Sequence, residues 1–445
     1  MTKETTTSLE LSGSCWALET SLNKLRKAAY GETSGGKSLS LVTFRLNDFD
    51  LDVSAAAAVV QLVRKHESTL KFVTLQECTG HTDIVLTVAL TIPIKCCSLS
   101  LGRLATAASS PCMHALGVGL QISHSLRDLI LQAGSNVFFT LDSHAARSLE
   151  QGLGNNSSLE SFTLKCCRFG DPSAVRLLAQ GLRRNGNLRY VTIRSCFVEN
   201  GHALDDLSLG TLIQALELNT KLTTLDVSGN KCLDRGMAAL ATLLDRTHMQ
   251  KLDISSQCIE RDESMNISML VASLGRTTSL QRLDLRFNKL NDEDMAYLAA
   301  ALSHNESIRF LGLASNQIGN VGLSILASKV PQFRGLSQLV LTNNLFDADG
   351  ASELAVAMQS NLQLGVVECD FRIPNTRIIQ YYADLNWAGR KYLSETTPKL
   401  ISLPSSLWPF VIQRVNRLTR KDNGIERCAN VLYFLLREGP ALFPR

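Results

Sequence analysis

One segment of the sequence matches a motif that binds phosphate groups in other proteins. Gly31-Glu-Thr-Ser-Gly-Gly-Lys-Ser38 fits the phosphate-binding pattern Gly-x-x-x-x-Gly-Lys-Ser at every position. In nucleotide-binding proteins this loop follows a strand and precedes a helix, so that N–H groups at the helix start meet the phosphates. Here the order is reversed, because residues 21–30 show a helical pattern and residues 39–46 a strand pattern. We therefore interpret the segment as a glycine-serine linker and expect no cofactor.

Three aspartates recur at one position of the periodic pattern described below: Asp226, Asp253 and Asp284. Neighbouring strands of a sheet lie ~5 Å apart, so these carboxylates could stack and attract a cation or a basic partner. Basic residues stand close enough in the sequence to neutralise them: Lys251, Arg282 and Arg286. The pattern therefore predicts no metal site.

A second set combines cations with aromatic rings. It consists of Lys165, Arg194 and Arg286, with Tyr190, Phe287 and Phe310 nearby. Exposed aromatic residues and arginines are the usual anchors of protein interfaces. Together with Asp226, Asp253, Arg282 and Asp284, this set is the candidate surface for a partner. The alternative is a solvated edge without function.

Catalytic patterns are absent from the sequence. The eight histidines are scattered, and there is no Gly-x-Ser-x-Gly segment and no acid–base pair above chance. The twelve cysteines include no Cys-x-x-Cys pair, which argues against a zinc site of that kind. We expect reduced thiols that act as small apolar residues, and a protein that is not an enzyme.

The elements that must position these residues repeat along the chain. The pattern Leu-x-x-Leu-x-Leu-x-x-Asn begins at Leu222, Leu280, Ile308 and Leu336. Weaker copies begin before Leu222 and once between Leu222 and Leu280: at Leu41, Leu70, Leu126, Leu159, Leu188 and Met249. Degenerate copies lie near Cys97 to Leu99 and Leu364 to Cys369, which gives about twelve units.

This spelling resembles the leucine-rich repeat, in which each unit is one strand and one helix. Between the strands the apolar spacing becomes helical, as in Met295, Leu298 and Leu302. A unit near 28 residues with a full helix resembles the ribonuclease-inhibitor-like subclass. The resemblance covers roughly Leu41 to Cys369 and implies an α/β solenoid: a curved horseshoe with a parallel sheet on the concave face and helices on the convex face.

Within each unit the leucines should point between the strand and helix layers. The ninth residue, such as Asn288 or Asn316, should hydrogen-bond backbone groups where the chain leaves the strand. Cys167 and Cys196 occupy that position in earlier units, where the repeat allows cysteine. Gln257 and Gly134 depart from the pattern and predict looser turns.

Composition fits this reading. Apolar residues make up 45% and charged residues 19% of the 445 residues, and the net charge is only +4, which does not indicate a nucleic-acid partner. No apolar run approaches the ~18 residues that span a bilayer, and the first residues lack a secretory pattern. We expect no membrane contact and a cytoplasmic location, with the nucleus left open.

We expect three segments: an N-terminal helical or flexible part (1–38), the repeats (39–371) and a helical C-terminal cap (372–445). Residues 408–418 and 425–438 show helical patterns. The combination Leu-Asn-x-Ala-Gly-Arg, Leu-Pro-x-x-Leu-Trp-Pro and a final Leu-Leu-Arg-Glu-Gly-Pro-Ala-Leu resembles the tail of uncharacterised leucine-rich repeat proteins of diatoms and similar algae. Such a segment could cover the exposed end of the solenoid core.

The function expected from this scaffold is protein binding through the concave face, without catalysis. Two alternatives remain. Leu403-Pro-Ser-Ser-Leu-Trp408 loosely resembles the adaptor-binding box of ubiquitin-ligase substrate receptors. One class of GTPase-activating proteins shares this repeat type, which implies a regulator of a small GTPase. The sequence identifies neither the partner nor the oligomeric state.

Overall fold

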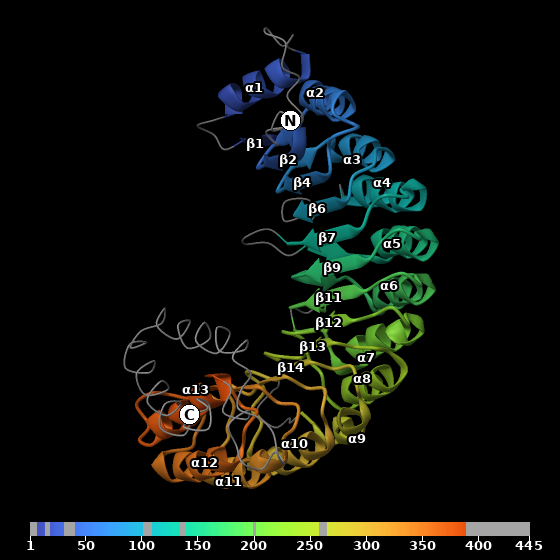
Figure 1. The fold of residues 1–445 in the computed structure, drawn as a ribbon. Helices are drawn as coiled ribbons and strands as arrows, with labels where there is room; N and C mark the ends of the chain where they lie inside the picture. Colours follow the sequence, from blue (N-terminus) through green and yellow to red (C-terminus); the bar gives the residue numbers. More distant parts are fainter. Residues whose placement is uncertain are drawn as a thin grey trace, which may run out of the picture. The chain divides into compact units, whose positions relative to one another are not determined.

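The computed structural model describes residues 7–13, 18–30, 41–100, 109–133, 139–198, 202–257 and 265–388. The chain divides into two compact units, Met1–Met249 and Gln250–Arg445. Each unit alternates strands and helices, and its strands pair in parallel. The alternation predicted from the repeats is therefore present in both units (Figure 1).

The sheet of the first unit is ordered as in the sequence. Its strands are β1 (Thr7–Ser12), β2 (Leu41–Asn47), β4 (Phe72–Gln76), β6 (Cys96–Ser100), β7 (Asp128–Gln132), β9 (Ser161–Lys165), β11 (Tyr190–Arg194) and β12 (Thr224–Asp226). The degenerate repeat near Cys97 is thus a full strand. β1 was not anticipated from the sequence; it pairs in parallel with β2.

Helices cover one face of this sheet (Figure 1). They are α1 (Leu18–Tyr30), α2 (Val53–Lys65), α3 (Thr82–Thr91), α4 (Ser109–Ile122), α5 (Ser143–Asn155), α6 (Pro172–Arg184), α7 (Asp206–Ala215) with the 3-10 turn η1 (Leu216–Leu218), and α8 (Asp234–Arg246). Two further pairs of short parallel strands follow the main strands: β3 (Asp50–Leu51) with β5 (Thr79–Gly80), and β8 (Phe139–Leu141) with β10 (Cys167–Phe169).

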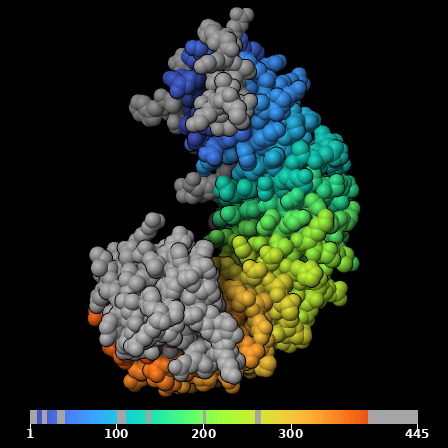
Figure 2. All heavy atoms as spheres, in the orientation of Figure 1, coloured from blue at the N-terminus to red at the C-terminus, as the bar shows by residue number. Residues whose placement is uncertain are grey.

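Small residues bring the helices of this unit close together. A Cβ atom on Gly152 of α5 would lie 2.9 Å from the carbonyl oxygen of Gly117 in α4, and one on Gly181 of α6 would lie 2.8 Å from the Cα of Glu150 in α5. Both distances are shorter than ordinary packing allows. Only glycine therefore permits this spacing, and the space-filling view shows successive parts of the unit packed directly against each other (Figure 2).

The second unit repeats the arrangement. Its strands, again in sequence order, are β13 (Lys251–Asp253), β14 (Arg282–Asp284), β15 (Phe310–Gly312), β16 (Gln338–Val340) and β17 (Val366–Glu368). Its helices are α9 (Ser268–Arg276), α10 (Asp292–His304), α11 (Asn320–Lys329) with the 3-10 turn η2 (Val330–Gln332), α12 (Ala348–Ser360) and α13 (Thr376–Ala388).

Helix α10 shows why the sequence folds this way locally. The side chain of Asn291 accepts hydrogen bonds from the backbone N–H groups of Glu293 and Asp294, and the Asp294 carboxylate accepts one from the Asn291 N–H. This reciprocal cap satisfies N–H groups that have no partner inside the helix. The predicted apolar face, Met295, Leu298 and Leu302, is buried between strands and helix.

The core of each unit is made by the repeated apolar residues. Leu283 of β14 pairs in register with Leu311 of β15, and both are fully buried, as are the leucines that follow two residues later, Leu285 and Leu313. At roughly 25 cal/mol per Å² of apolar area, this continuous layer is the main source of stability. The prediction that these leucines point inward is confirmed.

Helix α13 lies within residues 372–445, the segment predicted to be a cap. It packs against α12 and β17 and buries Ile379, Ala383 and Leu385, as a repeat helix does. Residues 408–418 and 425–438, predicted to be helical, lie outside the described residues.

Candidate partner-binding surface

Each sheet has one face toward the helices and one face away from them. We call the second face the strand face of the unit. Along a strand, alternate side chains point to it, and their exposure follows that alternation: β9 and β11 each have two buried residues separating three that are half or fully exposed. All ten residues proposed from the sequence lie on these strands or directly after them.

In the first unit the structure brings two cations together. Lys165, the last residue of β9, is the register partner of Arg194, the last residue of β11. Tyr190 begins β11 and is 48% exposed. Like charges directly opposite each other destabilise a sheet. The pair therefore weakens the fold slightly and offers a doubly cationic surface at one end of β11, while the accessible ring stands at the other end of the same strand face.

Asp226, also in the first unit, is turned toward its own chain. Its carboxylate accepts a 2.9 Å hydrogen bond from the Ser228 N–H and a 2.6 Å hydrogen bond from the Ser228 hydroxyl. Asp253 of the second unit accepts a 3.0 Å bond from the Ser255 N–H in the same way. Both side chains stay half-buried and help to fix the turn after the strand.

In the second unit Asp284 of β14 forms an ion pair with Arg286. Asp284 is 1% exposed and receives two 2.7 Å hydrogen bonds from Arg286, from Nε and from Nη2. Nη2 of Arg282 lies 3.4 Å from the same carboxylate. The hydrogen bonds to Asp284 raise the pKa of the Arg286 guanidinium above its usual value. Asp284 thus binds two arginines and is itself inaccessible.

Arg282 also covers Phe310. Its guanidinium carbon lies 3.5 Å from the centre of the Phe310 ring, a cation–π contact between register partners on β14 and β15. The ring was expected to be exposed, but it is half-buried under Arg282. The accessible surface here therefore consists of the guanidinium groups of Arg282 and Arg286. They lie over the Phe310 ring and the Asp284 carboxylate.

Phe287 is the accessible ring of this cluster. It is 57% exposed, and its φ of 59° lies in the left-handed region. The residue in this eighth position has a positive φ in unit after unit, and elsewhere it is small or polar: Asp48, Glu77, Cys166, Ser195, Gly229, Ser256, Ser315 and Asn343. A bulky residue is disfavoured there, so Phe287 is the exception in the series.

The ninth residue fixes the turn, as predicted. The Oδ1 of Asn316 accepts hydrogen bonds from the N–H groups of Asn288 (2.9 Å) and Leu290 (3.1 Å), and its Nδ2 donates to the carbonyls of Leu285 (3.1 Å) and Leu313 (2.9 Å). Each such asparagine therefore joins its own unit to the preceding one. Gln257 remains within this ladder, since its N–H donates to Asn288 Oδ1; Gly134 lies outside the described residues.

Cysteines take the ninth position in several repeats of the first unit, among them Cys196. The Cys196 thiol contacts the carbonyl oxygens of Leu164 (3.9 Å) and Arg194 (3.6 Å), and Asn230 donates to the corresponding carbonyls one unit later. Burial raises the pKa of the Cys196 thiol to about 12. In the described part of the chain no group of three or more His, Cys, Asp or Glu residues is placed to hold a metal ion.

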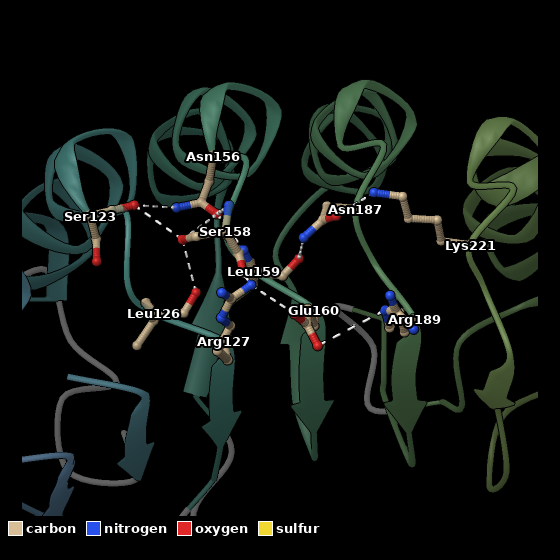
Figure 3. A network of polar contacts seen from close by, with 10 residues as sticks. All are labelled: Ser123, Leu126, Arg127, Asn156, Ser158, Leu159, Glu160, Asn187, Arg189 and Lys221. Carbon is tan, nitrogen blue, oxygen red and sulfur yellow. Dashed lines mark hydrogen bonds and ion pairs between the residues drawn. The ribbon is translucent and has the colours of Figure 1, made fainter. Parts of the chain in front are cut away.

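A second ladder of asparagines was missed from the sequence. Asn156 ends helix α5 and donates to the carbonyls of Leu120 (2.6 Å) and Ser123 (3.1 Å) in the preceding unit (Figure 3). Its Oδ1 accepts from the N–H groups of Ser158 and Leu159. Asparagines whose side-chain Nδ2 donates to a carbonyl of the preceding unit in the same way are Asn185, Asn219, Asn305, Asn361 and Asn386. All but the last stand three residues before the first apolar residue of a repeat, and this spacing was the available signal.

The entrances to the strands in the first unit carry ion pairs (Figure 3). Nη1 of Arg127 lies 2.7 Å from Glu160 Oε1, and Nε of Arg189 lies 4.0 Å from Glu160 Oε2. Lys221 donates a 2.7 Å hydrogen bond to Asn187. These exposed contacts contribute little stability each. They pair these charges at the strand entrances, whereas the cations Lys165 and Arg194 stand at the opposite ends of β9 and β11.

Two sequence-based expectations concern the ends of the chain. The phosphate-loop segment falls in residues 31–40, outside the described residues, and α1 before it and β2 after it have the predicted order. Leu403 to Trp408, which resembles an adaptor-binding box, also lies outside them. Among the described helices none is both long and apolar enough to cross a membrane.

Comparisons with known proteins agree with the repeats. A family model described as Leucine Rich repeat matches residues 218–241, 277–299 and 304–327. No curated protein matches the chain.

The similar solved structures include the following three. An internalin from Listeria monocytogenes is 18% identical, with a TM-score of 0.41, over 74% of this chain and 72% of that one. The actin-binding site 2 of leiomodin-1 is 18% identical, with a TM-score of 0.29, over 31% and 83%. The tropomodulin C-terminal domain of Caenorhabditis elegans is 15% identical, with a TM-score of 0.32, over 35% and 96%. The family match covers three repeats of the chain, and the strand-and-helix units have the fold of an α/β leucine-rich repeat solenoid.

Proposed function

We propose that this chain is a non-enzymatic scaffold that binds a protein partner through the strand faces of its repeats. The observation that carries the proposal is that each unit combines an accessible ring with cations along its strands or directly after them: Tyr190 at the start of β11 with Arg194 and Lys165 at the ends of β11 and β9 in the first unit, and Phe287 next to Arg286 in the second. Aromatic residues and arginines are enriched among the residues that dominate binding energy.

The cost of these residues to the fold supports the proposal. Lys165 and Arg194 repel each other across β9 and β11, and Phe287 occupies a backbone conformation that disfavours a large side chain. Burial of these side chains offsets neither the repulsion between Lys165 and Arg194 nor the unfavourable backbone conformation of Phe287. Both are explained by a partner that supplies carboxylates opposite the two cations and an apolar pocket for each ring.

Two finer assignments belong to the same proposal. Full helices of 13 residues, as in α5, α6 and α8, favour the ribonuclease-inhibitor-like subclass. The buried cysteines have unpaired thiols, which suits a reducing compartment such as the cytoplasm. A role as ubiquitin-ligase receptor or GTPase regulator is favoured by nothing in the described residues.

The test is affinity capture with the full chain as bait, followed by measurement of partner affinity. Tyr190→Ala and Arg194→Glu should each weaken binding at least about tenfold, the scale of an interface anchor. The matched control is Tyr297→Ala, because Tyr297 is 47% exposed but lies on helix α10, away from the strand face.

Exposed substitutions should leave the free energy of unfolding within about 0.5 kcal/mol of the wild type. A lost interaction then cannot be attributed to unfolding. If Tyr297→Ala weakens capture as much as Tyr190→Ala does, the helix layer and not the strand face is the binding surface.

A further inference from the structure

A row of charged residues crosses the first unit where the chain enters the strands. Each residue stands directly before its strand and one position after the first apolar residue of its repeat. The backbone N–H of each donates to the carbonyl of the one before, at 2.7–2.8 Å, so the row runs over neighbouring strands roughly 5 Å apart. We call these residues the entrance row: Lys71, Lys95, Arg127, Glu160 and Arg189.

The charge of the entrance row is not balanced within the unit. Four of its five residues are cations and one is a carboxylate, a net charge of +3. Glu160 is shared between Arg127 (2.7 Å) and Arg189 (4.0 Å) (Figure 3). Among the described residues neither Lys71 nor Lys95 forms an ion pair; Nζ of Lys71 donates to a backbone carbonyl at 3.4 Å. Like charges on neighbouring strands repel, so this row costs the fold some stability.

The second unit shows that the repeat does not require such a row. The residues in the same position are joined by the same backbone hydrogen bonds, and only one of them is charged: Gln250, Gln281, Arg309, Ser337 and Gly365. Nη1 of Arg309 donates a 2.7 Å hydrogen bond to the carbonyl of Gly335. The cations are therefore a property of the first unit and not of the scaffold.

An accessible ring stands beside each end of the entrance row. Phe72 follows Lys71 and is 42% exposed, and Tyr190 follows Arg189 and is 48% exposed. They begin β4 and β11, which are four strand spacings apart, so the rings are about 19 Å from each other. The register partners between them are half-exposed and smaller: Cys96, Asp128 and Ser161.

We propose that the entrance row binds an acidic helical segment of a protein partner. Its carboxylates would pair with Lys71, Lys95 and Arg127, and apolar side chains at its two ends would cover Phe72 and Tyr190. The segment supplies the anions that the unit itself lacks, and complementary charge fixes where it binds. This rests on the proposed function, because the occupant is part of a protein partner, and it adds the chemistry of that partner.

The spacing of the row favours a helix. Side chains three and four residues apart on one helix face lie about 5–6 Å apart, close to the roughly 5 Å between strands. Alternate residues of an extended chain lie about 6.6 Å apart and match the row less well. The carboxylates of Glu160 and Asp128 favour a protein over a nucleic acid. A peptide can place neutral residues opposite them, whereas a nucleic acid carries a phosphate at every nucleotide.

The test measures binding of a synthetic peptide to the full chain by fluorescence anisotropy. The probe is an alanine-based helical peptide with leucine near each end and glutamates spaced i, i+4, i+7 and i+11. The comparison peptide has glutamine at those four places. The glutamate peptide should bind about tenfold or more tightly, and added salt should reduce the difference. Equal affinity of the two peptides overturns the proposal.

Three variants locate the binding site. Lys95→Glu should weaken binding of the glutamate peptide about tenfold or more, whereas Arg309→Glu, in the same position of the second unit, should change it by less than about twofold. Glu160→Gln should strengthen binding about threefold or more, because it removes the carboxylate of the row. Its exposed ion pairs contribute little to stability, and a gain of affinity is not produced by damage to the fold.

Equal effects of Lys95→Glu and Arg309→Glu, or a loss of affinity in Glu160→Gln, overturn the proposal. So does a single-stranded oligouridine that binds more tightly than the glutamate peptide and is released by Lys95→Glu, since the row then serves a nucleic acid. Partner capture through Tyr190 and Arg194 is measured separately. If capture depends on those residues while the peptide ignores the row, the proposed function stands and this proposal fails.

Discussion

The guanidinium of Arg286 and the carboxylate of Asp284 form two parallel hydrogen bonds of 2.7 Å, and both groups come from the same strand end. The two residues are adjacent on the strand face because they stand two positions apart. Arg282 approaches the same carboxylate from the other side, so one buried carboxylate orders two arginines. Asp284 therefore organises the surface without being part of its exposed area.

The Asp284→Ala substitution should lower the free energy of unfolding by about 1–3 kcal/mol, since charge-assisted hydrogen bonds are lost and Arg286 is left without its anion. Urea unfolding measures the change. Asp253→Ala is the control, because Asp253 is half-exposed. Equal losses for the two variants would mean that the Arg286 pair contributes nothing specific.

The Asn316→Ala substitution should cost about 2–4 kcal/mol, because four hydrogen bonds that join two units are lost and buried backbone groups are left unpaired. Gln317→Ala, at the exposed neighbouring residue, should cost less than about 0.5 kcal/mol. Partner affinity should stay the same in both. A loss of affinity at unchanged stability would assign Asn316 to the interface and contradict its purely structural role.

The strands and helices could be predicted from the sequence because each repeat carries its own spacing of apolar residues. The hydrogen bonds of the ninth-position asparagines, such as Asn316, were also predicted from this spacing. The burial of Asp284 could not be predicted, since it depends on Gly312, its register partner 28 positions later: a Cβ there would lie 2.8 Å from the Asp284 Oδ1. Likewise β1 has no repeat pattern, and its strand forms by pairing with β2.

The candidate surface was predicted in kind but not in detail. Exposure of Tyr190 and Phe287 followed from their positions relative to the leucines. The contact in which Arg282 covers the Phe310 ring could not be predicted, because it depends on the direction of the Arg282 side chain toward the next strand. Long side chains choose among several neighbours, and only the packed sheet decides between them.

Stability should fall above about pH 9. Burial raises the pKa of the Cys78 and Cys112 thiols to about 11, and that of Cys196 to about 12, from an ordinary value near 9. The unfolded thiols lose their protons first, so the contribution is complete below the unfolded pKa and is lost as pH rises toward the folded one. Each thiol contributes at most about 1.4 kcal/mol per pH unit in this window.

Urea unfolding at pH 8.0 and at about pH 10.5 measures this loss, and Cys78→Ala should make it smaller. If the free energy of unfolding is the same at both pH values, the thiols ionise in the folded protein and are not shielded as their burial indicates.

The Phe287→Asn substitution separates stability from function. Asparagine tolerates a positive φ, whereas a bulky residue there costs of order 1–3 kcal/mol, so the variant should be as stable as the wild type or more stable by about 1 kcal/mol. Partner affinity should fall, because the exposed ring is gone. Ser315→Asn, at the equivalent position one unit later, changes no ring and controls for the backbone. A Phe287→Asn protein that is less stable and binds normally would show that the ring serves the fold.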